Sequence, residues 1–233
     1  MHTDPAPHAL QSHYDAIWER SRAAIGTGDI DCDARLLQGP DPRRGLTLIA
    51  RPGATLAGRF THLLERLDAL EPGQYLHPAA DLHVTVLSLF TVGDDFQPQL
   101  ARLGDYRDAV RCAVQGLPAF EIDFRGVTAS RGAVLAQGYP RGDTLATLRE
   151  RLRAELRARA LDASLDRRYR LVTAHATLLR FVRPLRQPRR FAEAIEGLRG
   201  AALGVMRVER VELVVNDWYM SSASLRQVEM LDL

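Results

Sequence analysis

A strand–helix–strand order that occurs twice along the chain is the feature that most constrains the fold. Each copy has an apolar stretch, a proline, an amphipathic helical stretch and a second apolar stretch, and the copies occupy residues 45–90 and 132–181. Equivalent positions lie 88 residues apart at the prolines, 89 at the Thr-Leu pairs that open the helices and 92 at a histidine in the last stretch. This near-constant offset predicts two copies of one α+β unit.

Both copies end in a predicted strand that carries a histidine and a threonine two positions apart. "DLHVTVLSLF" contains His83 and Thr85, and "TAHATLLRF" contains His175 and Thr177. Side chains alternate between the faces of a strand, so each histidine shares a face with its threonine. A lone histidine in a strand is most often a hydrogen-bonded core residue. The repetition of the pair at equivalent positions instead favours a functional role.

Two such pairs, packed about a pseudo-two-fold axis, suit in-line displacement at a phosphate. A neutral imidazole takes the proton of the attacking water, and an imidazolium protonates the leaving oxygen. The usual histidine pKa of about 6.5 permits both forms near neutral pH, which predicts a bell-shaped activity profile with limbs on either side of neutrality. Threonine hydroxyls donate to the non-bridging oxygens.

The motifs do not read as a metal site. Each supplies one histidine and one threonine, and threonine is a poor zinc ligand. His77 lies near His83 in sequence, but Pro78 and a loop separate them, so we do not expect a joint site. We predict neither a metal nor a cofactor.

The remaining pattern divides the chain into residues 1–44 and residues 45–233. The first part reads as a flexible arm over 1–10, a helix over 12–25 and a loop, and the second as one bilobal domain. The expected elements are strands at 45–51, 81–90, 119–130, 132–138 and 173–181, helices at 54–71, 96–116, 143–161 and 189–199, and two strands within 206–233.

Charge and cysteine content restrict the partners. The formal net charge is +2 and all 31 cationic residues are arginines, which argues against an extended nucleic-acid surface and for recognition of an anion in a cleft. Cys32 and Cys112 make no disulfide framework, which is typical of a reducing cytoplasm. We find neither a signal sequence nor an apolar run of about 18 residues, so the expected protein is cytoplasmic and does not bind membranes. The oligomeric state stays open.

At the two motifs the chain resembles the 2H phosphoesterase superfamily. Both have the form hydrophobic-His-x-Thr-hydrophobic, "LHVTV" at 82–86 and "AHATL" at 174–178, and the resemblance extends over roughly 45–230. It implies an α+β fold with two pseudo-symmetric lobes, antiparallel sheets around a central groove and helices outside. The RNA-processing branch, the RNA 2′,3′-cyclic phosphodiesterases or 2′-5′ RNA ligases, hydrolyses phosphodiesters without a metal.

Other positions follow from this resemblance. That branch contacts phosphate with an arginine five residues after the second histidine, where this chain has Arg180. Strand alternation places Arg180 opposite His175, so it needs a bulge to reach the groove. The counterpart after the first motif is Ser88. The branch's base-stacking aromatic residue is missing from "GLTLIARP", and we expect stacking from elsewhere and one further phosphate contact. The candidates are Tyr139, Trp218 and Tyr219 for stacking and Arg51 for phosphate.

The sequence thus predicts a phosphodiesterase acting on a cyclic phosphate or related phosphodiester of a nucleotide or RNA end. His83 and His175 are the expected acid and base, and Thr85, Thr177 and Arg180 the expected phosphate ligands. One alternative is a non-catalytic nucleotide- or RNA-binding module, and another is 2′-5′ RNA ligation by the reverse reaction. A purely structural protein would bury the repeated polar pairs without purpose.

Overall fold

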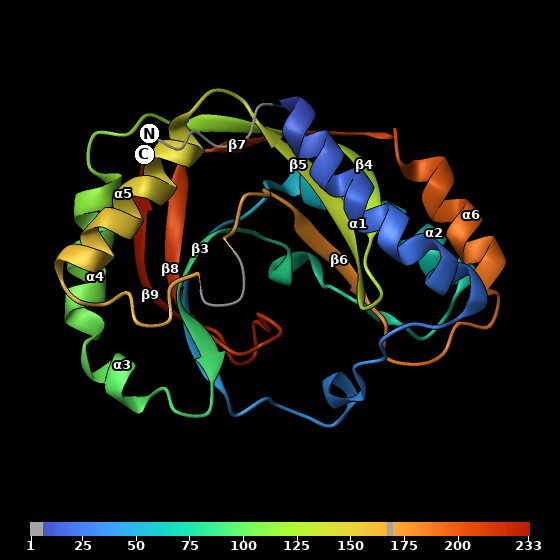
Figure 1. The fold of residues 1–233 in the computed structure, drawn as a ribbon, viewed down its shortest axis with the longest axis horizontal. Helices are drawn as coiled ribbons and strands as arrows, with labels where there is room; N and C mark the ends of the chain where they lie inside the picture. The colour runs from blue at the N-terminus through green and yellow to red at the C-terminus, as the bar shows by residue number, and fades with distance from the viewer. Residues whose placement is uncertain (1–6, 167–169) are drawn as a thin grey trace.

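A computed structural model describes residues 7–166 and 170–233. In this part of the chain one antiparallel sheet of nine strands runs in the order β7-β4-β5-β6-β3-β1-β8-β9, with the short β2 beside β6 (Figure 1). The strands are β1 Arg44–Ala50, β2 Tyr75–Leu76, β3 Val84–Gly93, β4 Phe120–Ala129, β5 Ala133–Pro140, β6 Ala176–Arg180, β7 Ala202–Val208, β8 Arg210–Asn216 and β9 Arg226–Asp232. The helices are α1 Pro7–Thr27, α2 Ala54–Leu70, α3 Gln97–Ala101, α4 Leu103–Val114, α5 Thr144–Ala158 and α6 Pro188–Leu198.

The sheet has two halves that meet at the centre of the two motifs. One half holds β7, β4, β5 and β6, the other β3, β1, β8 and β9, and the halves join where Val84 pairs with Ala176. These are the middle residues of the two His-x-Thr motifs. The predicted repeat is therefore present as β1-α2-β3 and β5-α5-β6, and the α+β prediction with pseudo-symmetric halves is confirmed.

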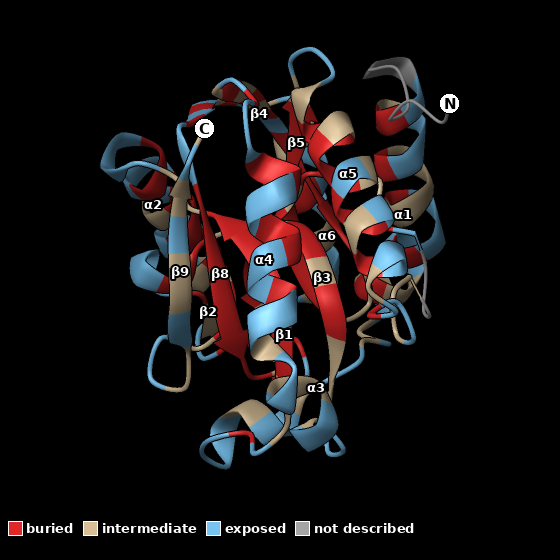
Figure 2. Ribbon diagram, turned by 90° about the vertical axis from the view of Figure 1, so that its left-hand side faces the viewer, coloured by how far each residue is buried: buried red, intermediate tan, exposed pale blue. Residues whose placement is uncertain are grey.

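Each unit's helix covers the other unit's strands. Helix α2 follows β1 but packs against β6 and β7, whereas α5 follows β5 but packs against β3 (Figure 1). The apolar stripes that the sequence showed are buried in these contacts, including Phe60 on α2 and Leu148 on α5. The outer faces of the helices are exposed, as α4 shows (Figure 2). The helices are thus exchanged, and the strands that each one contacts most belong to the half of the sheet that does not contain its own unit.

Several element boundaries differ from the sequence-based expectation. The helix expected at 96–116 is two helices, because Arg102 leaves helical geometry with φ −98° and ψ 18°. The C-terminal region has three strands rather than two: β7 and β8 are separated only by Glu209, yet they belong to opposite halves of the sheet. The sequence prediction treated this segment as one strand, although the adjacent polar residues Glu209 and Arg210 interrupt its alternation at the break. The two-residue β2 was too short to predict.

The N-terminal helix is longer than predicted and packs onto the sheet. It begins at Pro7, inside the segment expected to be a flexible arm, of which residues 1–6 lie outside the described residues. Tyr14 and Trp18 are buried, and the Tyr14 hydroxyl both donates to the Gly138 carbonyl (3.1 Å) and accepts from the Gly138 N–H (3.2 Å). Helix α1 therefore covers β4 and β5.

Candidate active site

The two motifs lie side by side, and their histidines stand at equivalent places. His83 and His175 each immediately precede a strand rather than lying inside one, because β3 begins at Val84 and β6 at Ala176. The antiparallel pair Val84–Ala176 sets His83 across from Thr177 and His175 across from Thr85. Directly opposed side chains of such a pair have their Cβ atoms about 4.5–5.5 Å apart. One face of the junction thus carries both imidazoles and both hydroxyls.

A bulge follows each motif. Thr85 and Leu87 of β3 pair with two consecutive residues of β1, so Val86 is an extra residue in β3. In the same way, Thr177 and Leu179 of β6 pair with two consecutive residues of β5, so Leu178 is an extra residue in β6. Each bulge resets the alternation, so that the fifth residue after the histidine returns to the motif's face. The bulge needed for Arg180 is present, and a second one acts on Ser88.

A cavity of about 260 Å³ lies over this junction. Both histidines and both threonines line it, together with Arg180 and Ser88. Its other lining residues are Thr47, His77, Leu87, Thr91, Val92, Asp166, Leu171, Asn216, Trp218, Tyr219 and Met220. The structure therefore brings into one cavity seven of the nine candidate site residues named from the sequence.

His83 has a defined tautomer. Its Nδ1 lies 2.7 Å from the carbonyl oxygen of Asp81, which can only accept, so Nδ1 carries the proton and Nε2 has the lone pair. Burial lowers the pKa of His83 to about 4, and the positive charges of Arg51 and Arg180 act in the same direction. The Asp81 carbonyl and carboxylate oppose this shift, since both stabilise the protonated ring.

His175 lies in a more cationic environment. Its Nδ1 is 2.7 Å from the Thr173 hydroxyl, which can donate or accept and so permits either tautomer. Burial lowers the pKa of His175 to about 4, followed in importance by the charges of His83, Arg149 and Arg180. Every one of these neighbours disfavours its protonated form.

The expectation of one protonated histidine in the free protein at neutral pH stays a prediction. The pKa values of both rings lie well below the usual histidine value, which favours two neutral imidazoles before a ligand binds. The sequence could not show this, because it gives neither the burial of the rings nor the arginines around them.

His77 is a cavity residue that sequence reasoning set aside. His77 directly follows β2, and β2 pairs with β6 beside the second motif. This pairing places His77 in the same cavity as His83. The ring is 3% exposed, and neither nitrogen has a hydrogen-bond partner among the described residues. Burial lowers the pKa of His77 to about 3, with Arg180 and His83 adding to the shift. His77 is thus a neutral third imidazole near the motifs.

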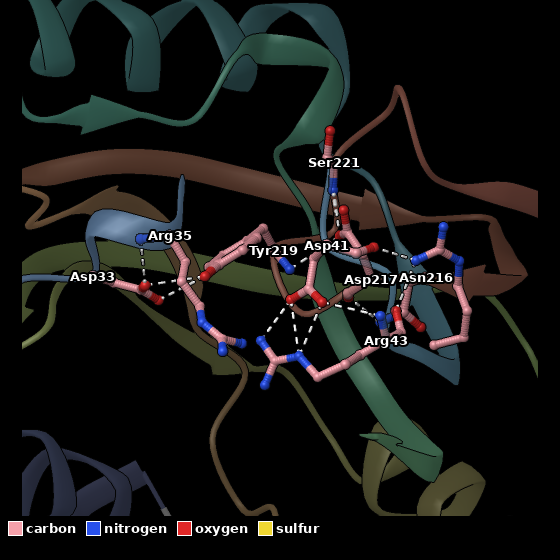
Figure 3. A network of polar contacts seen from close by, with 9 residues as sticks. Asp33, Arg35, Asp41, Arg43, Asn216, Asp217, Tyr219 and Ser221 are labelled. Atoms are coloured by element: carbon pink, nitrogen blue, oxygen red, sulfur yellow. Dashed lines mark hydrogen bonds and ion pairs between the residues drawn. The ribbon is translucent and has the colours of Figure 1, made fainter. Parts of the chain in front are cut away.

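Tyr219 on the cavity wall is part of a polar network with Asp33 and the segment Asn216–Ser221 (Figure 3). The Tyr219 hydroxyl donates to both carboxylate oxygens of Asp33 (3.0 and 2.9 Å), and burial together with Asp33 raises the pKa of Tyr219 to about 12. Arg43 pairs with Asp41 and places its guanidinium carbon 5.3 Å from the centre of the Trp218 ring. The wall is therefore pre-organised.

Two candidates lie elsewhere. Tyr139 does not line the cavity: its ring packs in T-shaped geometry against Tyr14, 5.5 Å between centroids, and its hydroxyl donates to glutamine side chains. The alternation of β5 directs it toward α1. Arg51 is also not a lining residue, because it pairs with Glu212 (3.1 Å) and donates to the Ala80 carbonyl (2.5 Å). Its charge still reaches His83.

Within residues 7–166 and 170–233, no three His, Cys, Asp or Glu side chains gather in an arrangement that could hold a metal ion. In the same part of the chain, no helix has the length and apolar character needed to cross a membrane.

A curled antiparallel sheet with two symmetric His-x-Thr motifs over one cavity is the architecture of a 2H phosphoesterase. The family model described as the 2′-5′ RNA ligase superfamily matches residues 56–219. The chain belongs to this superfamily. No curated protein matches the chain.

Solved structures share the fold at low sequence identity. The crystal structure of TT0787 from Thermus thermophilus has a TM-score of 0.61 and 16% identity, and covers 81% of this chain and 97% of its own. A crystal structure described as a phosphoesterase gives 0.53 and 17%, covering 82% and 99%. Escherichia coli LigT complexed with 3′-AMP gives 0.50 and 16%, covering 83% and 99%. These likenesses show the common fold.

Proposed function

We propose that the protein is a metal-independent phosphodiesterase that hydrolyses a cyclic phosphate or a related phosphodiester on a nucleotide or RNA end. The observation that carries this proposal is the Val84–Ala176 pair, which sets two imidazoles and two hydroxyls on one face of the junction. A module that only bound nucleotides would need neither two histidines nor their opposed arrangement.

The surroundings of the histidines support an assignment of acid and base. An anionic phosphate in the cavity raises the pKa of a nearby imidazole, and His83 is the better site for that proton because the Asp81 carbonyl and carboxylate stabilise its imidazolium. His175, whose charged neighbours all oppose protonation, is the base.

In hydrolysis of a 2′,3′-cyclic phosphate, His175 removes a proton from water as the water oxygen attacks phosphorus. The bond from phosphorus to the ring oxygen breaks on the opposite side, and that oxygen takes the proton of His83. The products are a ribose hydroxyl and a phosphate monoester, with the proton now on His175. Exchange with solvent restores the starting protonation state.

The charge on the phosphoryl oxygens would be met by three groups of the same cavity. Thr85 and Thr177 can donate to non-bridging oxygens, and Arg180 supplies a cation. A nucleotide fits the proposed substrate class, since LigT has been crystallised with 3′-AMP. Trp218 and Tyr219 on the cavity wall are the proposed contacts for its base.

Ligation is a second candidate, because the superfamily carries that name. If the 5′-hydroxyl of a second nucleotide attacks the 2′,3′-cyclic phosphate in place of water, and the bond from phosphorus to the 3′ oxygen breaks, the same two proton transfers give a 2′-5′ phosphodiester and a free 3′-hydroxyl.

A substrate screen in excess chelator tests the proposal. Purified protein is incubated with 2′,3′-cyclic nucleotides, RNA ending in a cyclic phosphate, and 2′-5′-linked dinucleotides. We expect turnover of at least one of these with EDTA present. Loss of turnover on chelation, with recovery on adding a divalent ion, would contradict the metal-independent mechanism. Tight binding of nucleotides with no turnover of any substrate would favour the binding module.

A further inference from the structure

A buried arginine connects the two motifs from behind. Arg149 lies on α5, is fully buried, and sends its guanidinium to backbone carbonyls of both halves of the sheet. Toward β3 it donates to Val86 (2.9 Å) and Thr85 (3.3 Å). Toward the segment before His175 it donates to Thr173 (2.6 Å) and Val172 (3.2 Å).

Three of the four carbonyls belong to residues that shape the site. Thr85 is a proposed phosphate ligand, and Val86 is the bulge residue that returns Ser88 to the cavity. Thr173 orients His175, since its hydroxyl lies 2.7 Å from the ring Nδ1. One planar guanidinium thus sets the distance between the first motif's backbone and the residue that holds the second histidine.

The repeat has no second such arginine. Thr55 and Thr144 are equivalent, with an offset of 89 residues, and the same offset aligns Arg149 with Phe60. Phe60 is also fully buried, but it packs against Phe124, with 5.2 Å between ring centroids. At this equivalent position the first unit therefore has a buried aromatic ring where the second has a buried cation.

We propose that Arg149 is a positioning residue that makes the symmetric pair of histidines functionally unequal. The planar fork of N–H donors in its guanidinium fixes Thr85 and Thr173 relative to each other. Its positive charge disfavours protonation of His175, so that His175 starts the reaction as the base. This inference rests on the proposed function for its catalytic part only, because the geometry and the charge are properties of the free protein.

Other charges act on His175 and must be held constant. The groups around it are His83 from the first motif, Arg180 on β6, His13 on α1 and Arg149 on α5. Three of them are unchanged when only Arg149 is replaced. A shift in the titration of His175 then reports the removal of the guanidinium.

Three replacements separate charge from geometry. Arg149→Gln and Arg149→Met remove the charge, whereas Arg149→Lys keeps a charge without the planar fork. Phe60→Leu is the matched control, since it trims a buried side chain at the equivalent position of the other unit. Circular dichroism selects the variants that fold.

The titration of the His175 ring is followed by NMR, with His175→Gln to assign the signal. We expect the pKa of His175 to rise by roughly one unit in Arg149→Gln or Arg149→Met, and to stay near the wild-type value in Arg149→Lys and Phe60→Leu. An unchanged titration in a folded charge-removing variant, or an equal shift in Phe60→Leu, would overturn the proposal.

The kinetic arm uses the best phosphodiester substrate. We expect kcat to fall by roughly tenfold or more in Arg149→Lys with little change in KM, because misplaced groups weaken the transition state more than binding. Wild-type kcat in folded Arg149→Lys would contradict the role of the fork, and this variant decides the question if both charge-removing variants fail to fold. The NMR arm needs no turnover, so failure of the proposed function and failure of this inference give different results.

Discussion

At the scale of single residues, the proposed site contains two imidazoles whose pKa values are both lowered in the free protein. Burial lowers the pKa of both His83 and His175 to about 4, far below the usual value near 6.5. A pair with one proton is then a minority form of the free protein at neutral pH. In the proposed reaction, the anionic substrate supplies the negative charge that stabilises this proton.

This has a direct consequence for the pH dependence of the reaction. In the free protein, the singly protonated pair becomes about tenfold rarer for each pH unit above the pKa values. We therefore expect kcat/KM to fall steadily between about pH 5 and pH 8, with a logarithmic slope approaching −1. The fall of kcat should begin at a higher pH than the fall of kcat/KM, since bound phosphate raises the pKa of the imidazole that carries the proton.

Initial rates across this range, with folding checked at each pH, measure both profiles. A kcat/KM profile that is bell-shaped and centred near neutrality would show that the free histidines titrate near their usual pKa. Burial and the nearby arginines would then not control the site.

At the scale of elements, the backbone around the motifs is set by close approaches that only glycine allows. Gly138 on β5 faces the segment before His175, and a Cβ atom there would lie 2.0 Å from the Ala174 carbonyl oxygen. The Tyr14 hydroxyl also bonds both backbone groups of Gly138. The place of His175 thus depends on a glycine of the neighbouring strand.

The variant Gly138→Ala tests this dependence. We expect it to lower the free energy of unfolding by about 1–3 kcal/mol, since an added methyl in a packed core forces the backbone to move, and to reduce kcat by displacing His175. Gly58→Ala is the control: nothing lies within 4 Å of its Cβ position on α2, and alanine there should stabilise the helix by about 0.5–1 kcal/mol. Wild-type activity and stability in Gly138→Ala would contradict the account.

Sequence reasoning predicted the positions of the two motifs better than their surroundings. The His-x-Thr pairs and the need for a bulge before Arg180 could be predicted, because alternation and spacing are local properties. Tyr139 was a possible substrate contact but packs against α1 instead of lining the cavity, and nothing local in the sequence shows that α1 covers that part of β5. His77 and Arg149 were missed because their contacts join segments far apart in the chain.

At the scale of the whole molecule, the exchanged helices make the two halves of the sheet interdependent. Helix α2 and helix α5 each cover strands of the other unit. We expect one cooperative unfolding transition, because opening either half exposes the apolar face of a helix from the other.

The two tryptophans allow this prediction to be measured. Trp18 lies on α1 over one half of the sheet, and Trp218 follows β8 in the other. Urea titrations of Trp18→Phe and Trp218→Phe, followed by fluorescence and circular dichroism, should give coincident transitions within each variant. In one variant, the fluorescence transition could precede the loss of secondary structure. The half of the sheet that carries the remaining tryptophan would then unfold independently.

The central claim is that His83 and His175 act together as acid and base, and single-turnover and steady-state rates of histidine variants test it most directly. His83→Ala and His175→Ala should each lower kcat at least ~10²-fold on the best phosphodiester, and the double variant should be little worse than either, because groups that act as a unit are not additive. His62→Ala, at an exposed position on α2, should retain wild-type activity. If either cavity histidine can be replaced with less than about a threefold loss of kcat, that residue is structural and the acid–base pair proposed here does not exist.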